Sequence, residues 1–70
     1  MIELNKTYKR RVYSNVFRYA TVTQIDLMNH CVTYTTVDKN INDIEIGRCE
    51  RVIGIKAFEE AYLQNDWSEL

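Results

Sequence analysis

Apolar and polar residues alternate along most of the chain, which is the pattern of half-buried β-strands. In residues 18–26, Ala20 and Val22 share one face, and Ile25 then falls out of phase with them. A bulge near Thr23-Gln24 would bring Ile25 back to that face. This first run therefore predicts a strand with one irregularity.

The next runs are also rich in Val, Ile, Thr and Tyr, which fit a pleated surface. In residues 31–37, Val32, Tyr34 and Thr36 are expected on one face, with Cys31, Thr33, Thr35 and Val37 on the other. Residues 41–47 and 49–53 are interpreted as two further short strands. Asparagine marks the turns, since it tolerates left-handed backbone; the turn positions are Asn15, Asn29, Asn40 and Asn42.

The period changes near residue 54. Ile55, Phe58 and Tyr62 are spaced by three and four residues, which predicts a short amphipathic helix over about 54–64. Asn65 is a candidate terminator, and residues 65–70 form a tail that contains Trp67. We expect the helix to close one end of the core. The whole chain, 1–70, is interpreted as a single domain with its strands within residues 8–53.

Loop length decides which side chains of the first hairpin, residues 8–19, share a face. A two-residue turn at Ser14-Asn15 would place Arg11 opposite Arg18, which is unfavourable for like charges. We therefore expect an odd loop of three or five residues. The inward set is then Tyr8, Val12, Ala20 and Val22, with Arg10 and Arg18 at its rim, and the outward set is Lys9, Arg11, Tyr13 and Tyr19, which Phe17 joins unless it sits in the loop.

Composition supports a globular chain, with 46% hydrophobic residues among 70. The net charge is −1, but residues 1–25 carry five cations and one carboxylate. Such asymmetry can steer one face toward a charged partner. The opening segment turns polar at once and no long apolar run follows, so we expect a cytoplasmic protein without a membrane span.

Few residues suggest chemistry. His30, Cys31 and Cys49 lack metal-ligand spacing, and adjacent strand residues point to opposite faces, so His30 would not activate Cys31. Asp43 and Glu45 share a predicted strand face and are expected to protect a solvated edge. No glycine-rich phosphate loop is present. We expect no enzyme, no metal and no cofactor.

Four segments carry a resemblance to a known group: "LNKTYKRR", "ATVTQID", "VTYTTV" and "FEEAYL". Their spacing resembles small SH3-like-barrel proteins of phages, prophages and bacteria. The resemblance implies a mainly β fold, a five-stranded SH3-like small barrel capped by a short helix. It also implies an accessory binding module, of a phage or mobile-element type, that blocks a host protein.

The resulting hypothesis is a non-enzymatic module that binds a protein partner and is able to form a homodimer. The acidic second half of the chain favours a protein, since it would repel a long polyanion. Nucleic-acid binding through hairpin 8–19 is the first alternative, and a structural subunit of a larger assembly is the second. The candidate partner-binding residues are Lys9, Arg11, Tyr13, Phe17, Arg18 and Tyr19.

Overall fold

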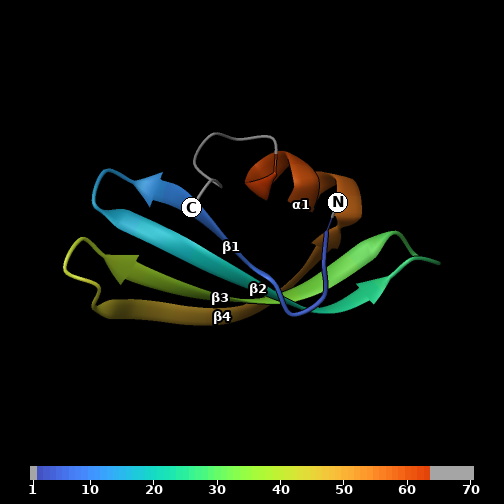
Figure 1. Ribbon diagram of the computed structural model, residues 1–70, viewed down its shortest axis with the longest axis horizontal. Helices are drawn as coiled ribbons and strands as arrows, with labels where there is room; N and C mark the ends of the chain where they lie inside the picture. Colours follow the sequence, from blue (N-terminus) through green and yellow to red (C-terminus); the bar gives the residue numbers. More distant parts are fainter. Residues whose placement is uncertain (1, 64–70) are drawn as a thin grey trace.

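The computed structural model describes residues 2–63 and shows an antiparallel sheet with one helix on its concave side (Figure 1). The strand order follows the sequence, so each strand pairs with its neighbour through a hairpin. The elements are β1 Thr7–Tyr13, β2 Val16–Asp26, β3 Cys31–Asn40, β4 Glu45–Gly54 and α1 Ile55–Tyr62. The predictions for Asn65 and Trp67 lie outside the described residues.

The first hairpin has the predicted register, although its loop is shorter than expected. Tyr13 pairs with Val16 across a two-residue turn, and a bulge between Arg11 and Tyr13 shifts the rest of the ladder by one residue. The prediction of an odd loop is therefore wrong. Because the bulge adds one residue to β1, it has the same effect on the two faces as an odd loop.

The β2–β3 pairing contains the predicted bulge, between Val22 and Gln24. It returns Ile25 to register with Val32, so that Ile25 packs against the core. The turn that follows is held by Asp26, whose carboxylate accepts hydrogen bonds from the backbone and side chain of Asn29. The left-handed residue there is His30, with φ 55°, rather than Asn29.

The second half of the predicted strand 41–47 and the whole of the predicted strand 49–53 belong to one continuous strand, β4, whereas residues 41–44 lie in the turn before it. Within residues 2–63 the sheet therefore has four strands rather than five. The preceding turn is built by Asn40, whose side-chain oxygen accepts from the backbone N–H groups of Asn42 and Ile44. Asp43 lies in that turn with φ 64°, which contradicts its predicted place on a strand face beside Glu45.

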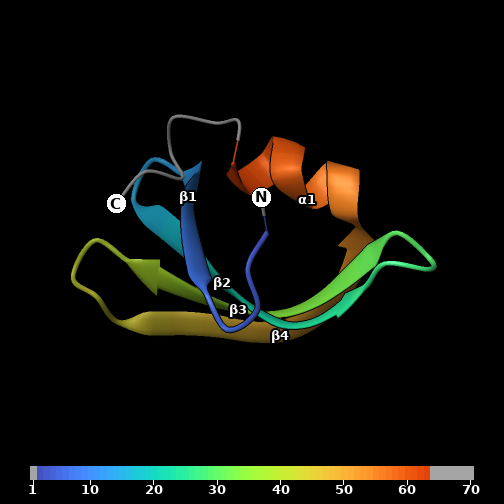
Figure 2. The same cartoon turned by 45° about the vertical axis from the view of Figure 1, so that its right-hand side comes forward.

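The sheet is open, and the predicted closed barrel is wrong. Figure 2 shows the sheet curving beneath α1, with β1 and β4 at separate edges. Closure would turn the inward positions of β1 and β2, Arg10 and Arg18, toward Arg51 of β4. Burying three guanidinium groups in a small core is unfavourable, because within residues 2–63 Asp38 pairs with Arg18 alone. The coarser prediction, a mainly β fold with one C-terminal helix, is confirmed.

An aromatic cluster fills the core between the sheet and α1. Phe58 is fully buried and lies 5.5 Å, 4.9 Å and 4.6 Å, ring centre to ring centre, from Tyr8, Tyr34 and Tyr62. The predicted helix stripe therefore faces the core, as expected. Among residues 2–63, no helix has the length and apolar character needed to cross a bilayer.

Candidate functional site: the outer face of the first hairpin

Two rows of side chains cross the convex face of the sheet, each with an aromatic ring on β2. In the first row Phe17 lies between Arg11 of β1 and Lys39 of β3. In the second row Tyr19 is paired with Lys9 of β1. We call these five residues the outer hairpin face. Strand alternation positions them, because they occupy every second residue of adjacent strands.

The cations of the outer hairpin face lie against its rings. The ammonium group of Lys9 is 4.6 Å from the centre of the Phe17 ring and 5.7 Å from that of Tyr19. Lys39 approaches Tyr19 to 5.4 Å, and the guanidinium carbon of Arg11 approaches Phe17 to 5.3 Å. These are cation–π distances. The predicted residues Lys9, Arg11, Phe17 and Tyr19 are thus brought together.

Two predicted site residues lie elsewhere. Tyr13 is 72% exposed and sits at the end of β1, beside the hairpin turn. Arg18 lies on the opposite, concave face, where its guanidinium donates two hydrogen bonds, of 2.8 Å and 3.0 Å, to Asp38. The bond to this carboxylate raises the pKa of Arg18. Arg18 is therefore separated from the outer hairpin face by the thickness of the sheet.

The concave face holds an arginine cluster that the sequence interpretation did not identify as a group. Arg10 pairs directly with Arg18, and its guanidinium carbon lies 5.6 Å from the centre of the Tyr62 ring. The buried Nε of Arg10 has no hydrogen-bond partner among the described residues. Arg51 donates to the Thr36 hydroxyl at 3.4 Å. The sequence pattern could have indicated this cluster, because each of the three arginines lies an even number of residues from an inward apolar residue of its own strand.

The tyrosines beside this cluster give a pH prediction. Burial raises the pKa of both Tyr34 and Tyr62. In the unfolded chain these phenols ionise at about pH 10, whereas in the folded chain they stay protonated to higher pH. The free energy of unfolding therefore falls as pH rises above that value. Each tyrosine contributes a slope of up to about 1.4 kcal/mol per pH unit. Urea unfolding across this range should show the loss.

Phenylalanine variants supply the control for this pH effect. The double variant Tyr34→Phe/Tyr62→Phe should lose less stability between neutral and alkaline pH than the wild type. Tyr13→Phe, at an exposed position, should leave the wild-type slope unchanged. Equal slopes in the double variant and in Tyr13→Phe would show that the buried phenols do not control alkaline unfolding.

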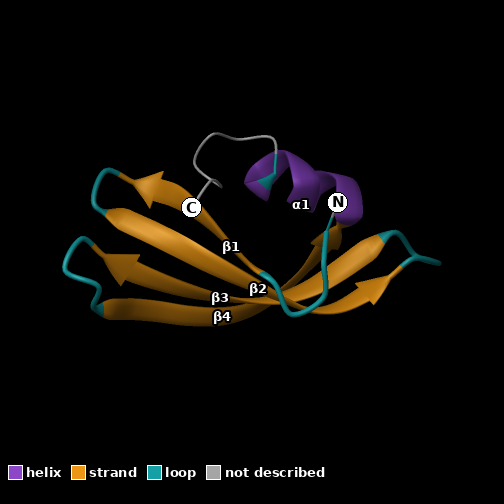
Figure 3. Cartoon of the chain, viewed as in Figure 1, coloured by secondary structure: helices purple, strands orange, loops and turns teal. Residues whose placement is uncertain are grey.

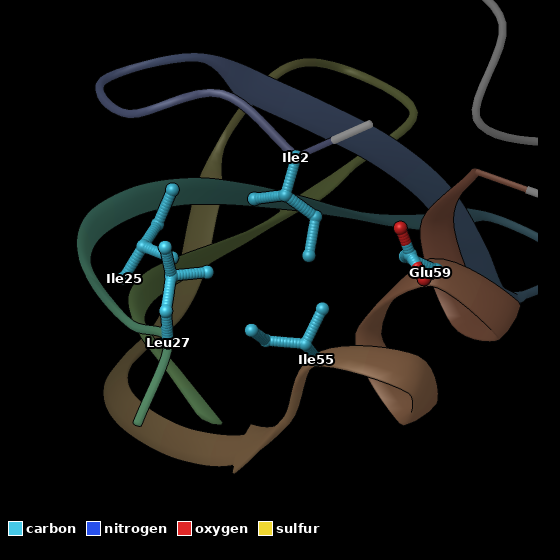
Figure 4. A pocket seen from close by; sticks show the side chains of 5 residues that line it. All are labelled: Ile2, Ile25, Leu27, Ile55 and Glu59. Carbon is cyan, nitrogen blue, oxygen red and sulfur yellow. The ribbon is translucent and has the colours of Figure 1, made fainter. Parts of the chain in front are cut away.

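A second surface feature is an apolar groove of about 480 Å³ between the sheet and the start of α1. Figure 4 shows Ile2, Ile25, Leu27 and Ile55 around a shared space, with Glu59 at its side. Four of its five lining side chains are apolar, whereas a typical ligand site also presents several polar groups that orient the ligand.

The thiols and the histidine are not assembled into a site. Cys49 pairs with Thr36, which faces the core, whereas Cys31 is adjacent to core residue Val32 and faces the other way. Both are free thiols on opposite faces of the sheet. Within residues 2–63, no cluster of three His, Cys, Asp or Glu side chains could hold a metal ion.

Comparison with known proteins identified no relative of this chain. The chain matches no protein-family model, no curated protein and no solved structure. A function for the outer hairpin face is therefore inferred from its side chains alone.

Proposed function

We propose that the chain is a non-enzymatic binding module whose outer hairpin face docks on an acidic segment of a protein partner. The observation that carries this proposal is the position of Lys9 between the rings of Phe17 and Tyr19. The rings hold the flexible lysine stem near one geometry. A held cation loses less conformational entropy on binding than a free one, so it is a better anchor for a carboxylate.

The arrangement favours a protein segment over nucleic acid. Bases bind single-strand surfaces by stacking on exposed ring faces, but here Lys9 and Lys39 already lie over Tyr19. A carboxylate can approach these cations without displacing them. Asp43 and Glu45 lie at the β3–β4 end of the sheet, beside Lys39 and Arg48. They would repel a long polyanion but leave room for a short acidic segment.

The resemblance to small SH3-like proteins extends the proposal to a class of partner. By that resemblance, the chain is a phage-type or mobile-element-type accessory protein that binds and modulates a host protein. The described residues form four strands and one helix, without the fifth strand that the resemblance implied.

Selection from a display library of random peptides tests the proposal. The wild-type protein should enrich peptides rich in Asp and Glu. Lys9→Glu should abolish this enrichment, because it replaces the central cation by a repelling charge. Phe17→Ala should weaken it, because it removes one of the two rings that hold Lys9.

Lys56→Glu is the matched control. It makes the same charge change on the exposed side of α1, away from the hairpin, and should enrich the same peptides as the wild type. If Lys9→Glu and Lys56→Glu reduce selection equally, only the net charge matters and the outer hairpin face is not the site. Selection of peptides without acidic residues would also overturn the proposal.

A further inference from the structure

The free edge of β4 is the longer of the two edges of the sheet that residues 2–63 form. β4 is an edge strand of ten residues, and Figure 3 shows no strand or helix of residues 2–63 beyond it. Its first half, residues 45–50, is exposed throughout. The strand contains no proline, and its unpaired N–H and C=O groups are a template for another strand, whereas its charged side chains limit which registers are allowed.

The ladder shows which backbone groups β4 offers. The Ile55 N–H donates to the His30 carbonyl at 2.8 Å, which continues the β3–β4 pairing by one step. Hydrogen-bonded pairs alternate in an antiparallel ladder. The backbone of Cys49 is therefore hydrogen-bonded to that of Thr36 in β3. The backbone N–H and C=O groups of Arg48, Glu50 and Val52 point to the open edge.

The side chains of the same residues are self-complementary. If a second copy pairs antiparallel with a two-fold axis at Cys49, Arg48 lies opposite Glu50 of the second copy, and Glu50 lies opposite its Arg48. Val52 then lies opposite Ile46, and both are exposed in the single chain. An axis at Arg48 or at Glu50 would instead put like charges opposite each other, which is unfavourable.

We propose that two copies of this chain associate through β4, in the register centred on Cys49, to form one continuous sheet of two four-stranded halves. The interface is separate from the outer hairpin face, which lies on β1, β2 and β3. Within the single chain Arg48 is bonded to Glu45 at 2.9 Å, and both groups are exposed. Such surface pairs contribute little, so Arg48 can exchange Glu45 for Glu50 of the second copy.

This register makes a covalent prediction. Cys49 would face Cys49 of the second copy in a non-hydrogen-bonded pair, where Cα atoms lie about 4.5 Å apart, within the range of a disulfide. Diamide oxidises two thiols to one disulfide and takes up the two protons and two electrons. A Cys31→Ser protein, which keeps Cys49 alone, should therefore yield a cross-linked dimer on a non-reducing gel. Cys49→Ser should not.

Charge variants test the register by sedimentation velocity. Arg48→Glu should shift the protein toward monomer, and Arg48→Glu/Glu50→Arg should restore the dimer because the pairs are exchanged. Glu45→Gln breaks the pair within the chain but should leave the dimer intact, and Lys56→Glu should do the same. A wild type that sediments as a monomer at every concentration would overturn the proposal. Failure of the double variant to restore the dimer would refute the register.

Discussion

Replacing Phe58 by alanine is expected to leave the chain largely unfolded. Phe58 is fully buried and contacts the rings of Tyr8, Tyr34 and Tyr62, which join the sheet to α1. Truncation of a buried phenylalanine destabilises proteins by about 3–5 kcal/mol. A domain of this size rarely has more than about 3–5 kcal/mol from its core. The loss is therefore comparable to the whole free energy of unfolding.

Circular dichroism with urea titration measures this effect, and the chain supplies its own control. Phe17→Ala removes the same side chain from the outer hairpin face, where the ring is only partly covered. It should remain folded and lose a small part of its free energy of unfolding. If the two variants unfold at similar urea concentrations, the core does not lie between the sheet and α1.

Asp38→Asn is expected to have the second-largest effect on stability. Its side chain is 21% exposed, and its carboxylate accepts both hydrogen bonds of Arg18, which stands directly opposite Arg10. An amide would leave two adjacent guanidinium groups without this counter-charge. Removing one partner of a fully buried pair costs about 3–5 kcal/mol. Partial exposure reduces this penalty, so we expect a loss of about 1–3 kcal/mol.

Urea unfolding of Asp43→Asn provides the comparison for Asp38→Asn. Asp43 forms an exposed ion pair with Lys39 at 3.5 Å, and such pairs contribute little. This variant should therefore retain almost the full wild-type stability. The double variant Arg18→Met/Asp38→Asn should recover part of the loss of Asp38→Asn. No difference between Asp38→Asn and Asp43→Asn would mean that the arginine cluster does not depend on Asp38.

The side of the sheet that each side chain occupies was predictable from the sequence, because side chains alternate strictly along a strand. The loss of phase at Ile25 was enough to locate the bulge near Thr23, and the same alternation placed Lys9, Arg11 and Tyr19 outward. Loop length was not predictable, since a tight turn with a bulge and an odd loop give the same faces. Both solutions satisfy the pattern, and only the pairing of Tyr13 with Val16 distinguishes them.

Closure and strand number were not predictable because they depend on contacts between distant residues. Arg48 was expected to lie between two separate strands, but it pairs with Val37 inside β4. The barrel prediction also required β1 and β4 to approach each other. That depends on whether Arg10 and Arg51 can be buried together, which the alternation of a single strand does not reveal.

The candidate site was only partly predictable, because one of its residues comes from a distant part of the sequence. Arg18 was expected both at the inward rim of the hairpin and among the partner-binding residues; the structure places it on the concave face with Asp38, since neighbours along a strand face opposite sides. Lys39 was missed because it comes from β3 and reaches the outer hairpin face only through the pairing of Phe17 with Lys39. A search for cations at matching register across all strands, instead of within the hairpin, would have found it.

The most direct measurement of the binding proposal is fluorescence anisotropy with two labelled probes, an acidic peptide of alternating Glu and Gly and a short oligothymidylate. We predict that the peptide binds the wild type and Lys56→Glu, that Lys9→Glu does not bind it, and that the oligonucleotide binds none of them at low salt. The contrary result is that the wild type binds the oligonucleotide and Lys9→Glu does not. The logarithm of that affinity would fall with the logarithm of the salt concentration, with a slope of about 0.7 per phosphate neutralised. That result would make the outer hairpin face a nucleic-acid surface.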